Sequence, residues 1–207
     1  MERVVSNAII SPDLQQYDLW EYLLVAHPDE AVNQKLKEER EHFFEQYKEK
    51  FPAKTRPTIV VASFTARESM EDTLIRWIHR VCSKQKSFPV TLNNYSGFPP
   101  HTIYLRVQDH QPFRQLASQL NVIDEYVQAN SCPPVKFIVR PHLSLVRRLE
   151  EEVYTRAIFD YAQKDFHETF LLNELVLLRR HNEFDDCHQV NVFRLFPPDT
   201  NMHAYVA

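Results

Sequence analysis

The chain has 207 residues, of which 43% are hydrophobic and 12% aromatic, enough apolar surface for one globular domain or two small lobes sharing a core. Its formal net charge of −4 argues against binding to long nucleic acid, which needs a broad basic surface, although a local cluster can still hold a small anion. Gly97 is the only glycine, so the glycine-dependent Walker loop, dinucleotide-binding turn and nucleophile elbow are excluded.

Signals for disulfides, metals and membranes are weak. The three cysteines, Cys82, Cys132 and Cys187, are odd in number and far apart, which predicts buried thiols rather than disulfides. The sequence has no CxxC pair, and the segment that begins at His167 departs from HExxH at its last position, so neither a metal nor another cofactor is predicted. Without an apolar leader or a membrane-spanning run, the sequence predicts a soluble, cytoplasmic protein with no membrane partner.

The hydrophobic pattern of the first half predicts alternating strands and helices. His27-Pro28-Asp29-Glu30 places a proline and two acids in a first helical turn, and Thr65-Ala66-Arg67-Glu68 has the spacing of a capping box. Glycine and two prolines within 97–100 are typical of a turn between strands. The predicted elements are a strand at 21–26, a helix to about Lys50, a strand at 57–64, a helix from the capping box to about Val81, and strands at 88–96 and 101–107.

From His101 onward the same order of elements returns. Pro112 begins a helix as Pro28 does, and a loop at 132–134 leads to a strand at 141–146, a helix through 153–161, and strands at about 169–178 and 188–195. We therefore predict an α+β fold with two halves related by a pseudo-twofold axis and mainly antiparallel sheets flanked by helices. The predicted parts are an N-terminal arm at 1–20, a single bilobal domain at 21–196 with lobes at about 21–107 and 101–196, and a C-terminal tail at 197–207.

The strand Pro141-His142-Leu143-Ser144-Leu145 carries the strongest functional signal. A histidine and a hydroxyl two residues apart on a strand point the same way, so one can pass a proton while the other binds a phosphate oxygen. The matching strand of the first half has Thr58 and Val60 at the corresponding positions. The repeat predicts that Thr58 and His142 lie on opposite sides of one cleft.

Each of these assignments has a structural alternative. A lone His-x-Ser/Thr tripeptide is a weak signal, as His167-Glu168-Thr169 shows by matching it at the start of a strand outside the repeat position. For His142 the alternative is a histidine satisfied by a hydrogen bond in the core. For Arg140, Arg147 and Arg148, an anion-binding rim and a solvated surface are both open.

Residues 21–195 resemble the two-histidine (2H) phosphoesterases, the family of LigT-like 2′-5′ RNA ligases and 2′,3′-cyclic phosphodiesterases. Three segments carry the resemblance: Pro141-His142-Leu143-Ser144-Leu145, Arg56-Pro57-Thr58-Ile59-Val60-Val61, and Phe98-Pro99-Pro100-His101-Thr102-Ile103-Tyr104. The resemblance implies a bilobal LigT-like α+β fold with a strand-lined groove, metal-free catalysis and one His-x-Thr/Ser motif from each lobe. In such a site one histidine is the general base, the other protonates the departing oxygen, and the hydroxyls hold the non-bridging phosphate oxygens.

The resemblance also implies roles for individual residues. His142 and Ser144 keep the catalytic roles, whereas Thr58 and Val60 are degenerate motif positions that line the cleft. The further candidates for phosphate or ligand contacts are His101, Tyr104, Arg140 and Arg147.

The implied substrate is a 2′,3′-cyclic phosphate or 2′-5′ phosphodiester of a nucleotide or RNA end, which the protein acts on or binds; extended double-stranded nucleic acid is not expected as a partner. Because loss of one acid–base group removes about 10²–10⁴ in rate, catalysis is expected to be impaired. At this point the sequence leaves open whether the chain is an enzyme. The alternatives are a non-catalytic nucleotide- or RNA-binding module and a protein-interaction module that uses the same cleft.

Overall fold

The computed structural model describes residues 19–48 and 56–197. The predicted N-terminal arm, apart from its last two residues, and the predicted C-terminal tail, apart from its first, lie outside the described residues. The elements in chain order are β1 Leu19–Ala26, α1 Glu30–Tyr47, β2 Ile59–Arg67, a 3₁₀ turn Glu68–Met70, α2 Glu71–Cys82, β3 Phe88–Phe98, β4 Thr102–Val107, α3 Gln111–Gln119, α4 Asn121–Ala129, β5 Lys136–Phe137, β6 His142–Val146, α5 Glu151–Tyr161, β7 His167–Leu172, β8 Glu174–Arg180 and β9 His188–Arg194.

The described strands form one antiparallel sheet of nine strands. Their order is β7-β3-β4-β6-β2-β1-β8-β9, and β5 pairs with β2. The two strands that carry the motif positions, β6 and β2, are neighbours in the middle of this order. The strands on either side also match in the chain-order repeat, since β4 flanks β6 where β1 flanks β2. The predicted α+β class with two related halves is therefore confirmed.

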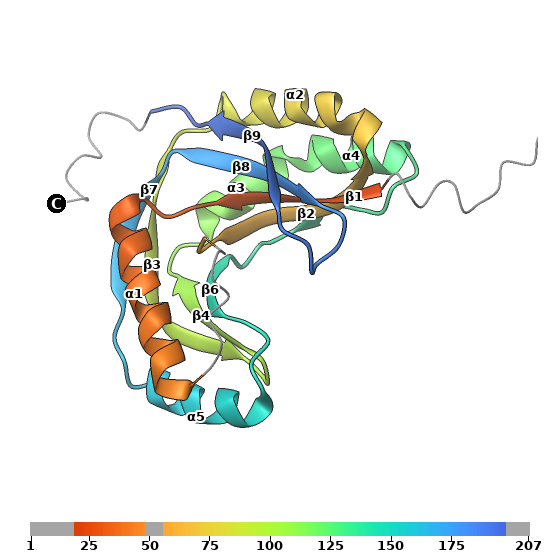
Figure 1. The fold of residues 1–207 in the computed structure, drawn as a ribbon. Helices are drawn as coiled ribbons and strands as arrows, with labels where there is room; N and C mark the ends of the chain where they lie inside the picture. The colour runs from red at the N-terminus through yellow and green to blue at the C-terminus, as the bar shows by residue number, and fades with distance from the viewer. Residues whose placement is uncertain (1–18, 49–55, 198–207) are drawn as a thin grey trace, which may run out of the picture.

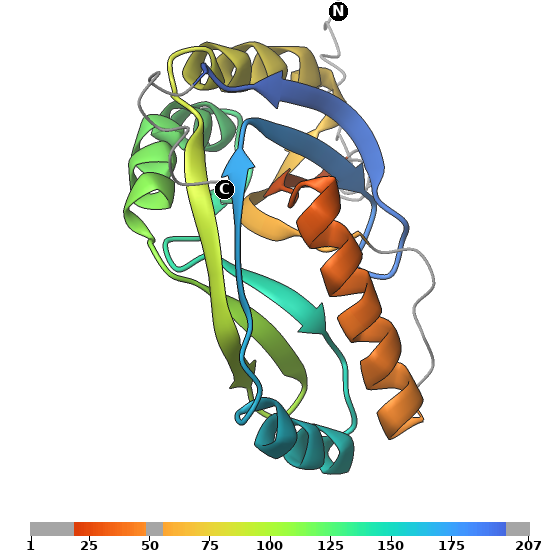
Figure 2. The ribbon, with the colours of Figure 1, turned by 90° about the vertical axis from the view of Figure 1, so that its left-hand side faces the viewer.

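The sheet is curled, and the helices lie along its outside (Figure 1). In that view α2 and α4 lie above β1, β2 and β8, whereas α1 and α5 border the part that contains β3 and β4. Figure 2 shows α1 running from the end of β1 towards α5. This contact is aromatic, because the Phe43 ring of α1 lies 5.6 Å from the Tyr161 ring of α5, centroid to centroid.

Two helix starts differ from the sequence prediction. Asp29 caps α1 by accepting a 2.9 Å hydrogen bond from the Val32 amide, so Pro28 precedes the helix rather than standing in its first turn. The capping box at Thr65 is wrong. Thr65 still belongs to β2, where it pairs with Glu21 of β1, and α2 begins only after the 3₁₀ turn. The longer ladder with β1 takes precedence over the local capping signal.

Two predicted elements are each divided in the structure. The helix after Pro112 is two helices, α3 and α4, which meet at Leu120. The strand predicted at about 169–178 is two strands separated by Asn173, and they go to different ends of the sheet: β7 pairs with β3, and β8 pairs with β1. Such long-range pairing leaves no local mark in the sequence.

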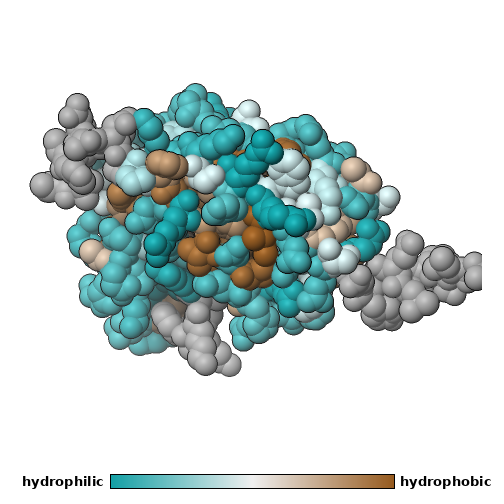
Figure 3. Space-filling view, turned by 90° about the horizontal axis from the view of Figure 1, so that it is seen from above, coloured by the Kyte–Doolittle hydropathy of each residue, from teal (hydrophilic) through white to brown (hydrophobic). Residues whose placement is uncertain are grey.

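The core is continuous across the sheet, and Ile59 of β2 and Leu143 of β6 are both fully buried within it. Figure 3 shows the face above α2, where most side chains are hydrophilic and a small hydrophobic group lies near the centre. No helix in the described part of the chain is long and apolar enough to cross a membrane.

Gly97 on β3 lies in close contact with α5. A Cβ atom at this position would collide with the Tyr154 hydroxyl and lie 2.9 Å from Ile158 Cδ1. We expect Gly97→Ala to lower the free energy of unfolding by about 1–3 kcal/mol, the usual cost of overpacking, as measured by urea denaturation. The loss should shrink when Tyr154→Phe removes the hydroxyl, and Ser96→Ala, on the other face of β3, should have little effect. An unchanged stability in Gly97→Ala would show that α5 is not held against β3 in this way.

Candidate functional site

The two motif strands meet through one register pair, Ile59 opposite Leu143. Both of these side chains are fully buried on the helix-covered side of the sheet. Because successive side chains on a strand alternate between faces, their sequence neighbours point the other way. Four half-buried side chains share this opposite surface, which we call the motif face: Thr58, Val60, His142 and Ser144.

The antiparallel register fixes which of the four are neighbours. Counting from the Ile59–Leu143 pair, Thr58 lies beside Ser144, and Val60 lies beside His142. A local twofold axis at that pair would exchange Thr58 with His142 and Val60 with Ser144. The four positions that the sequence analysis singled out are therefore brought together, in the symmetric relation expected from the repeat.

The half of the motif face on β2 carries no titratable group. The Thr58 hydroxyl donates a 2.7 Å hydrogen bond to the Arg56 carbonyl, and Val60 has no hydroxyl. A threonine hydroxyl titrates far above neutral pH, so this half cannot move a proton as an imidazole does. What remains of it is one hydroxyl and an apolar side chain.

His142 supplies the titratable group of the β6 half. Its Nδ1 atom lies 3.4 Å from the Arg140 carbonyl, and when Nδ1 carries the proton it donates to that oxygen and leaves Nε2 as the acceptor. Burial lowers the pKa of His142 from its ordinary value of 6.5, the Arg140 carbonyl opposes this, and the positive charge of Arg147 lowers the pKa further. The imidazole is consequently neutral at pH 7 and able to accept a proton.

The Ser144 hydroxyl is an unsatisfied hydrogen-bonding group among the described residues. Its Oγ atom is buried and makes no hydrogen bond to any described residue. Leaving a buried donor unsatisfied costs about 1–3 kcal/mol, so a buried hydroxyl of this kind calls for a partner, which a water molecule or a ligand can supply. A phosphate oxygen beside Ser144 would satisfy this hydroxyl.

Aromatic side chains border the site on the β4 side. The Phe98 and Tyr104 rings are stacked with centroids 4.3 Å apart, and each centroid is 5.0 Å from that of His142. Tyr104 also lies directly opposite Ser144 in the β4–β6 ladder. Phe98 is 48% exposed, so this cluster offers an open aromatic surface next to the histidine.

Arg147 provides positive charge close to the motif face. Partial burial, followed by the charges of Arg180 and Arg148, lowers its pKa, and its own charge acts on His142. Arg180 is paired with Glu21 at 2.7 Å and Arg148 with Glu183 at 3.5 Å, but the Arg147 side chain has no hydrogen bond or ion pair among the described residues. The Arg147 guanidinium could therefore form an ion pair with an anion bound near His142.

Two other candidates lie less directly in the site. Arg140 contributes its backbone carbonyl to His142, and its side chain is exposed. His101 lies in the β3–β4 turn, where its Nδ1 atom is 3.0 Å from the Leu149 carbonyl. The contacts of His101 are thus with the loop after β6 rather than with the motif residues, and its role stays a prediction.

Sequence reasoning missed two residues beside the motif positions. Arg106 lies opposite His142 in the β4–β6 ladder and is exposed. His27, just after β1, has its Nδ1 atom 3.2 Å from the Pro57 carbonyl, next to Thr58. Neither belongs to a local motif, so only the pairing of strands brings them to the site.

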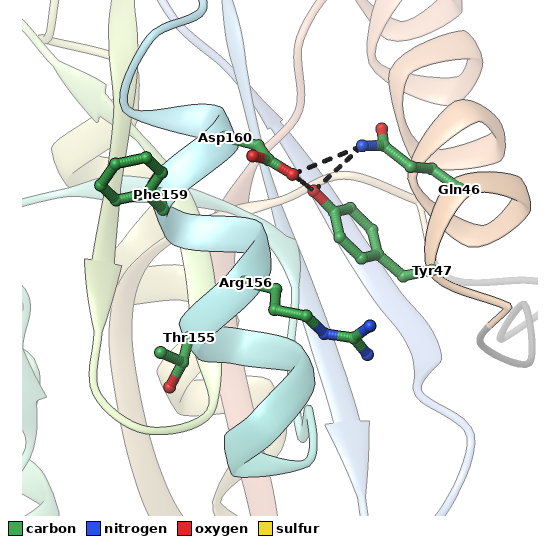
Figure 4. Close-up of a pocket in the computed structure, with 6 residues that line it drawn as sticks. All are labelled: Gln46, Tyr47, Thr155, Arg156, Phe159 and Asp160. Atoms are coloured by element: carbon green, nitrogen blue, oxygen red, sulfur yellow. Dashed lines mark hydrogen bonds between the residues drawn. The ribbon is translucent and has the colours of Figure 1, made fainter.

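A separate pocket of about 560 Å³ lies between the end of α1 and α5 (Figure 4). The Tyr47 hydroxyl donates a 2.5 Å hydrogen bond to Asp160 across it, and burial together with this carboxylate raises the pKa of Tyr47. None of its lining residues belongs to the motif face: Gln46, Tyr47, Thr155, Arg156, Phe159 and Asp160. We interpret it as the junction of two helices. Within 19–48 and 56–197, no three His, Cys, Asp or Glu side chains are grouped to hold a metal ion.

A curled antiparallel sheet with two motif strands at its centre defines the LigT-like α+β fold. The chain belongs to the 2'-5' RNA ligase superfamily, whose sequence pattern matches residues 28–183. This confirms the predicted relationship to the 2H phosphoesterases. No curated protein sequence matches the chain.

Solved structures share the fold at low sequence identity. The protein TT0787 of Thermus thermophilus superimposes with a TM-score of 0.65 and 16% identity, over 84% of this chain and 97% of its own. E. coli LigT in its apo form superimposes with a TM-score of 0.62 and 14% identity, over 86% of this chain and 99% of its own. For LigT complexed with 3'-AMP the TM-score is 0.59 and the identity 15%, over 86% of this chain and 98% of that one. At such identities the likeness establishes the fold.

Proposed function

We propose that this protein binds the phosphate of a nucleotide or RNA end on the motif face, and acts slowly on a 2′,3′-cyclic phosphate or 2′-5′ phosphodiester. The Ser144 hydroxyl is the observation that carries the proposal. It is buried and has no hydrogen-bond partner in the described part of the chain, and it lies beside a neutral histidine and near an arginine that forms no ion pair there. A hydroxyl, an imidazole and a guanidinium together suit a phosphate group.

The family supports a nucleotide as the ligand. E. coli LigT has been crystallised with phosphate, with 3'-AMP and with ATP. On this chain the stacked Phe98 and Tyr104 rings border His142, where a base or ribose attached to the phosphate would lie. Base stacking on an aromatic ring contributes about 1–3 kcal/mol.

Slow turnover follows from the β2 half of the site. An acid–base group contributes about 10²–10⁴ in rate, and neither Thr58 nor Val60 can supply one. Valine in place of a hydroxyl that binds a charged oxygen costs about 1.5–3 kcal/mol of further stabilisation. Since the proposed reaction uses side chains alone, activity should be unaffected by a metal chelator.

The second candidate is a binding module without turnover. The same two positions favour it, because a site that has lost one proton carrier and one phosphate contact can still hold an anion through Ser144 and Arg147. A protein partner on the same surface is the remaining alternative. Turnover by the purified protein separates the first candidate from these two, and nucleotide binding separates the second from the third.

A thermal-shift and calorimetric titration with 3′-AMP and a 2′,3′-cyclic nucleotide tests the binding site. A ligand at 100 times its Kd stabilises the folded state by about 2.7 kcal/mol, which raises Tm by several degrees in a chain of this size. We expect Ser144→Ala to weaken binding about 10- to 100-fold, the loss of a hydrogen bond to a charged oxygen. The same change should leave the unliganded protein as stable as before or slightly more so, because it removes a buried unsatisfied hydroxyl.

Ser118→Ala on the exposed side of α3 is the matched control and should change neither quantity. If Ser144→Ala binds the nucleotide as tightly as the unaltered protein, the phosphate site does not include Ser144 and must lie elsewhere. Absence of any nucleotide binding by the unaltered protein would rule out both nucleotide candidates and leave the protein-interaction alternative.

A further inference from the structure

His27 lies beside the position where the first motif histidine is missing. Ala26, the last residue of β1, pairs with Ile59 of β2, so the next residue along each strand brings His27 next to Thr58. Ala26 and Ile59 are fully buried on the outer side of the sheet, and alternation therefore directs His27 and Thr58 to the motif face. The 3.2 Å approach of His27 Nδ1 to the Pro57 carbonyl is an independent sign of this placement.

The pairing also aligns His27 with the phosphate-binding half of the site. Continued by one residue, the printed registers place His27 beside Thr58 and Thr58 beside Ser144, which pairs with Tyr104 of β4. Neighbouring strands are about 4.8 Å apart, so the backbone of His27 is about 10 Å from that of Ser144.

His27 and His142 are held in the same manner. Each has Nδ1 within reach of a backbone carbonyl, that of Pro57 or that of Arg140, and each then presents Nε2 as the free acceptor. Burial lowers the pKa of His27, the Pro57 carbonyl raises it, Arg56 lowers it and Glu174 of β8 raises it. These are the charged groups that act on His27, and both histidines are neutral at pH 7.

We propose that His27 supplies the second imidazole of the site, in place of the histidine absent at position 58, and this inference rests on the phosphoesterase function proposed above. In hydrolysis of a 2′,3′-cyclic phosphate, one imidazole takes a proton from water as the water oxygen bonds to phosphorus. The other first takes a proton from solvent, because both imidazoles are neutral at pH 7, and then gives it to the ribose oxygen whose bond to phosphorus breaks. The net change is the addition of one water, and protons exchange with solvent between turnovers.

The test is turnover of a 2′,3′-cyclic nucleotide by His27→Asn. The asparagine amide still donates to the Pro57 carbonyl but cannot exchange a proton, so the fold should be kept while the chemistry is lost. We expect kcat to fall about 10²–10⁴-fold, with 3′-AMP affinity changed only a few-fold. His27→Gln is a second variant in case Asn impairs folding, and His79→Asn on the exposed side of α2 is the matched control.

Rescue makes the test specific. Thr58→His in the His27→Asn background should restore turnover, because it returns an imidazole to the same part of the motif face. A His27 variant that is folded and as active as the unaltered protein would overturn the inference. The inference would also be overturned if the unaltered protein binds 3′-AMP but turns over substrate no faster than the His27→Asn/His142→Asn double variant. That result would leave the proposed nucleotide binding intact. Loss of binding in the unaltered protein would instead remove the proposed function itself.

Discussion

In a protein that carries His27→Asn, the double variant Thr58→His/Val60→Thr should raise turnover of a 2′,3′-cyclic nucleotide by about 10²–10⁴ over His27→Asn alone, the contribution of one general acid–base group. The register directs position 58 towards Ser144 and position 60 towards His142. The new imidazole would thus face the phosphate site from β2, and the new hydroxyl would add a contact to a phosphate oxygen. Steady-state kinetics with the purified proteins, with and without the two replacements, measures the gain in turnover.

The double variant is also expected to lose stability. Valine and threonine have similar volumes, but a half-buried hydroxyl without a partner costs about 1–3 kcal/mol in the absence of ligand. Thr58→His also removes the 2.7 Å hydrogen bond to the Arg56 carbonyl, worth about 0.5–1.5 kcal/mol. Urea denaturation of the variant should therefore show a folded but somewhat weakened protein.

Thr65→His is the matched control for the double variant. Thr65 is also on β2 but pairs with Glu21, well away from β6, so a histidine there should leave turnover unchanged. A double variant that is folded and binds 3′-AMP, yet gains nothing, would show that the site has diverged beyond these two positions. The non-catalytic binding module would then be the better description.

The fold was predictable where local pattern and tertiary structure agree. The apolar periodicity of α1 and the buried run of β2 correspond to observed elements, and the order of elements correctly indicated two related halves. The errors occurred where distant strands decide the outcome. Pairing of Thr65 with Glu21 extends β2 through the predicted helix start, and Asn173 separates two strands that pair with different partners.

The same distinction applies to the site. His142 and Ser144 could be proposed from the sequence because both lie in one tripeptide on one strand. His27 and Arg106 could not be placed beside the motif strands from the sequence, because they are 115 and 36 residues from His142 and come near these strands only through strand pairing. A histidine followed by proline at a strand end reads as a helix start, and only the register with Pro57 and Thr58 gives it a second interpretation.

His142→Asn should reduce turnover by about 10²–10⁴, since it removes the titratable group of the β6 half. Asparagine can still donate to the Arg140 carbonyl and occupies a similar position beside Tyr104, so the loss should fall on kcat more than on nucleotide affinity. Kinetics and calorimetry on the same preparation measure the two quantities. An equal loss in both would mean that His142 acts as a ligand contact only.

The pH dependence of stability gives a second measure of the same residue. Burial holds the folded-state pKa of His142 below 6.5, whereas the unfolded chain keeps the ordinary value. Between these two values the unfolded state binds more protons, so the free energy of unfolding falls as pH drops below about 6.5 and levels off below the folded-state pKa. His142→Asn should flatten this slope, which cannot exceed about 1.4 kcal/mol per pH unit for one group, while His27 retains its own share. If the slope of the free energy of unfolding against pH, between about pH 5 and 7, is the same in His142→Asn as in the unaltered protein, His142 is solvated rather than buried.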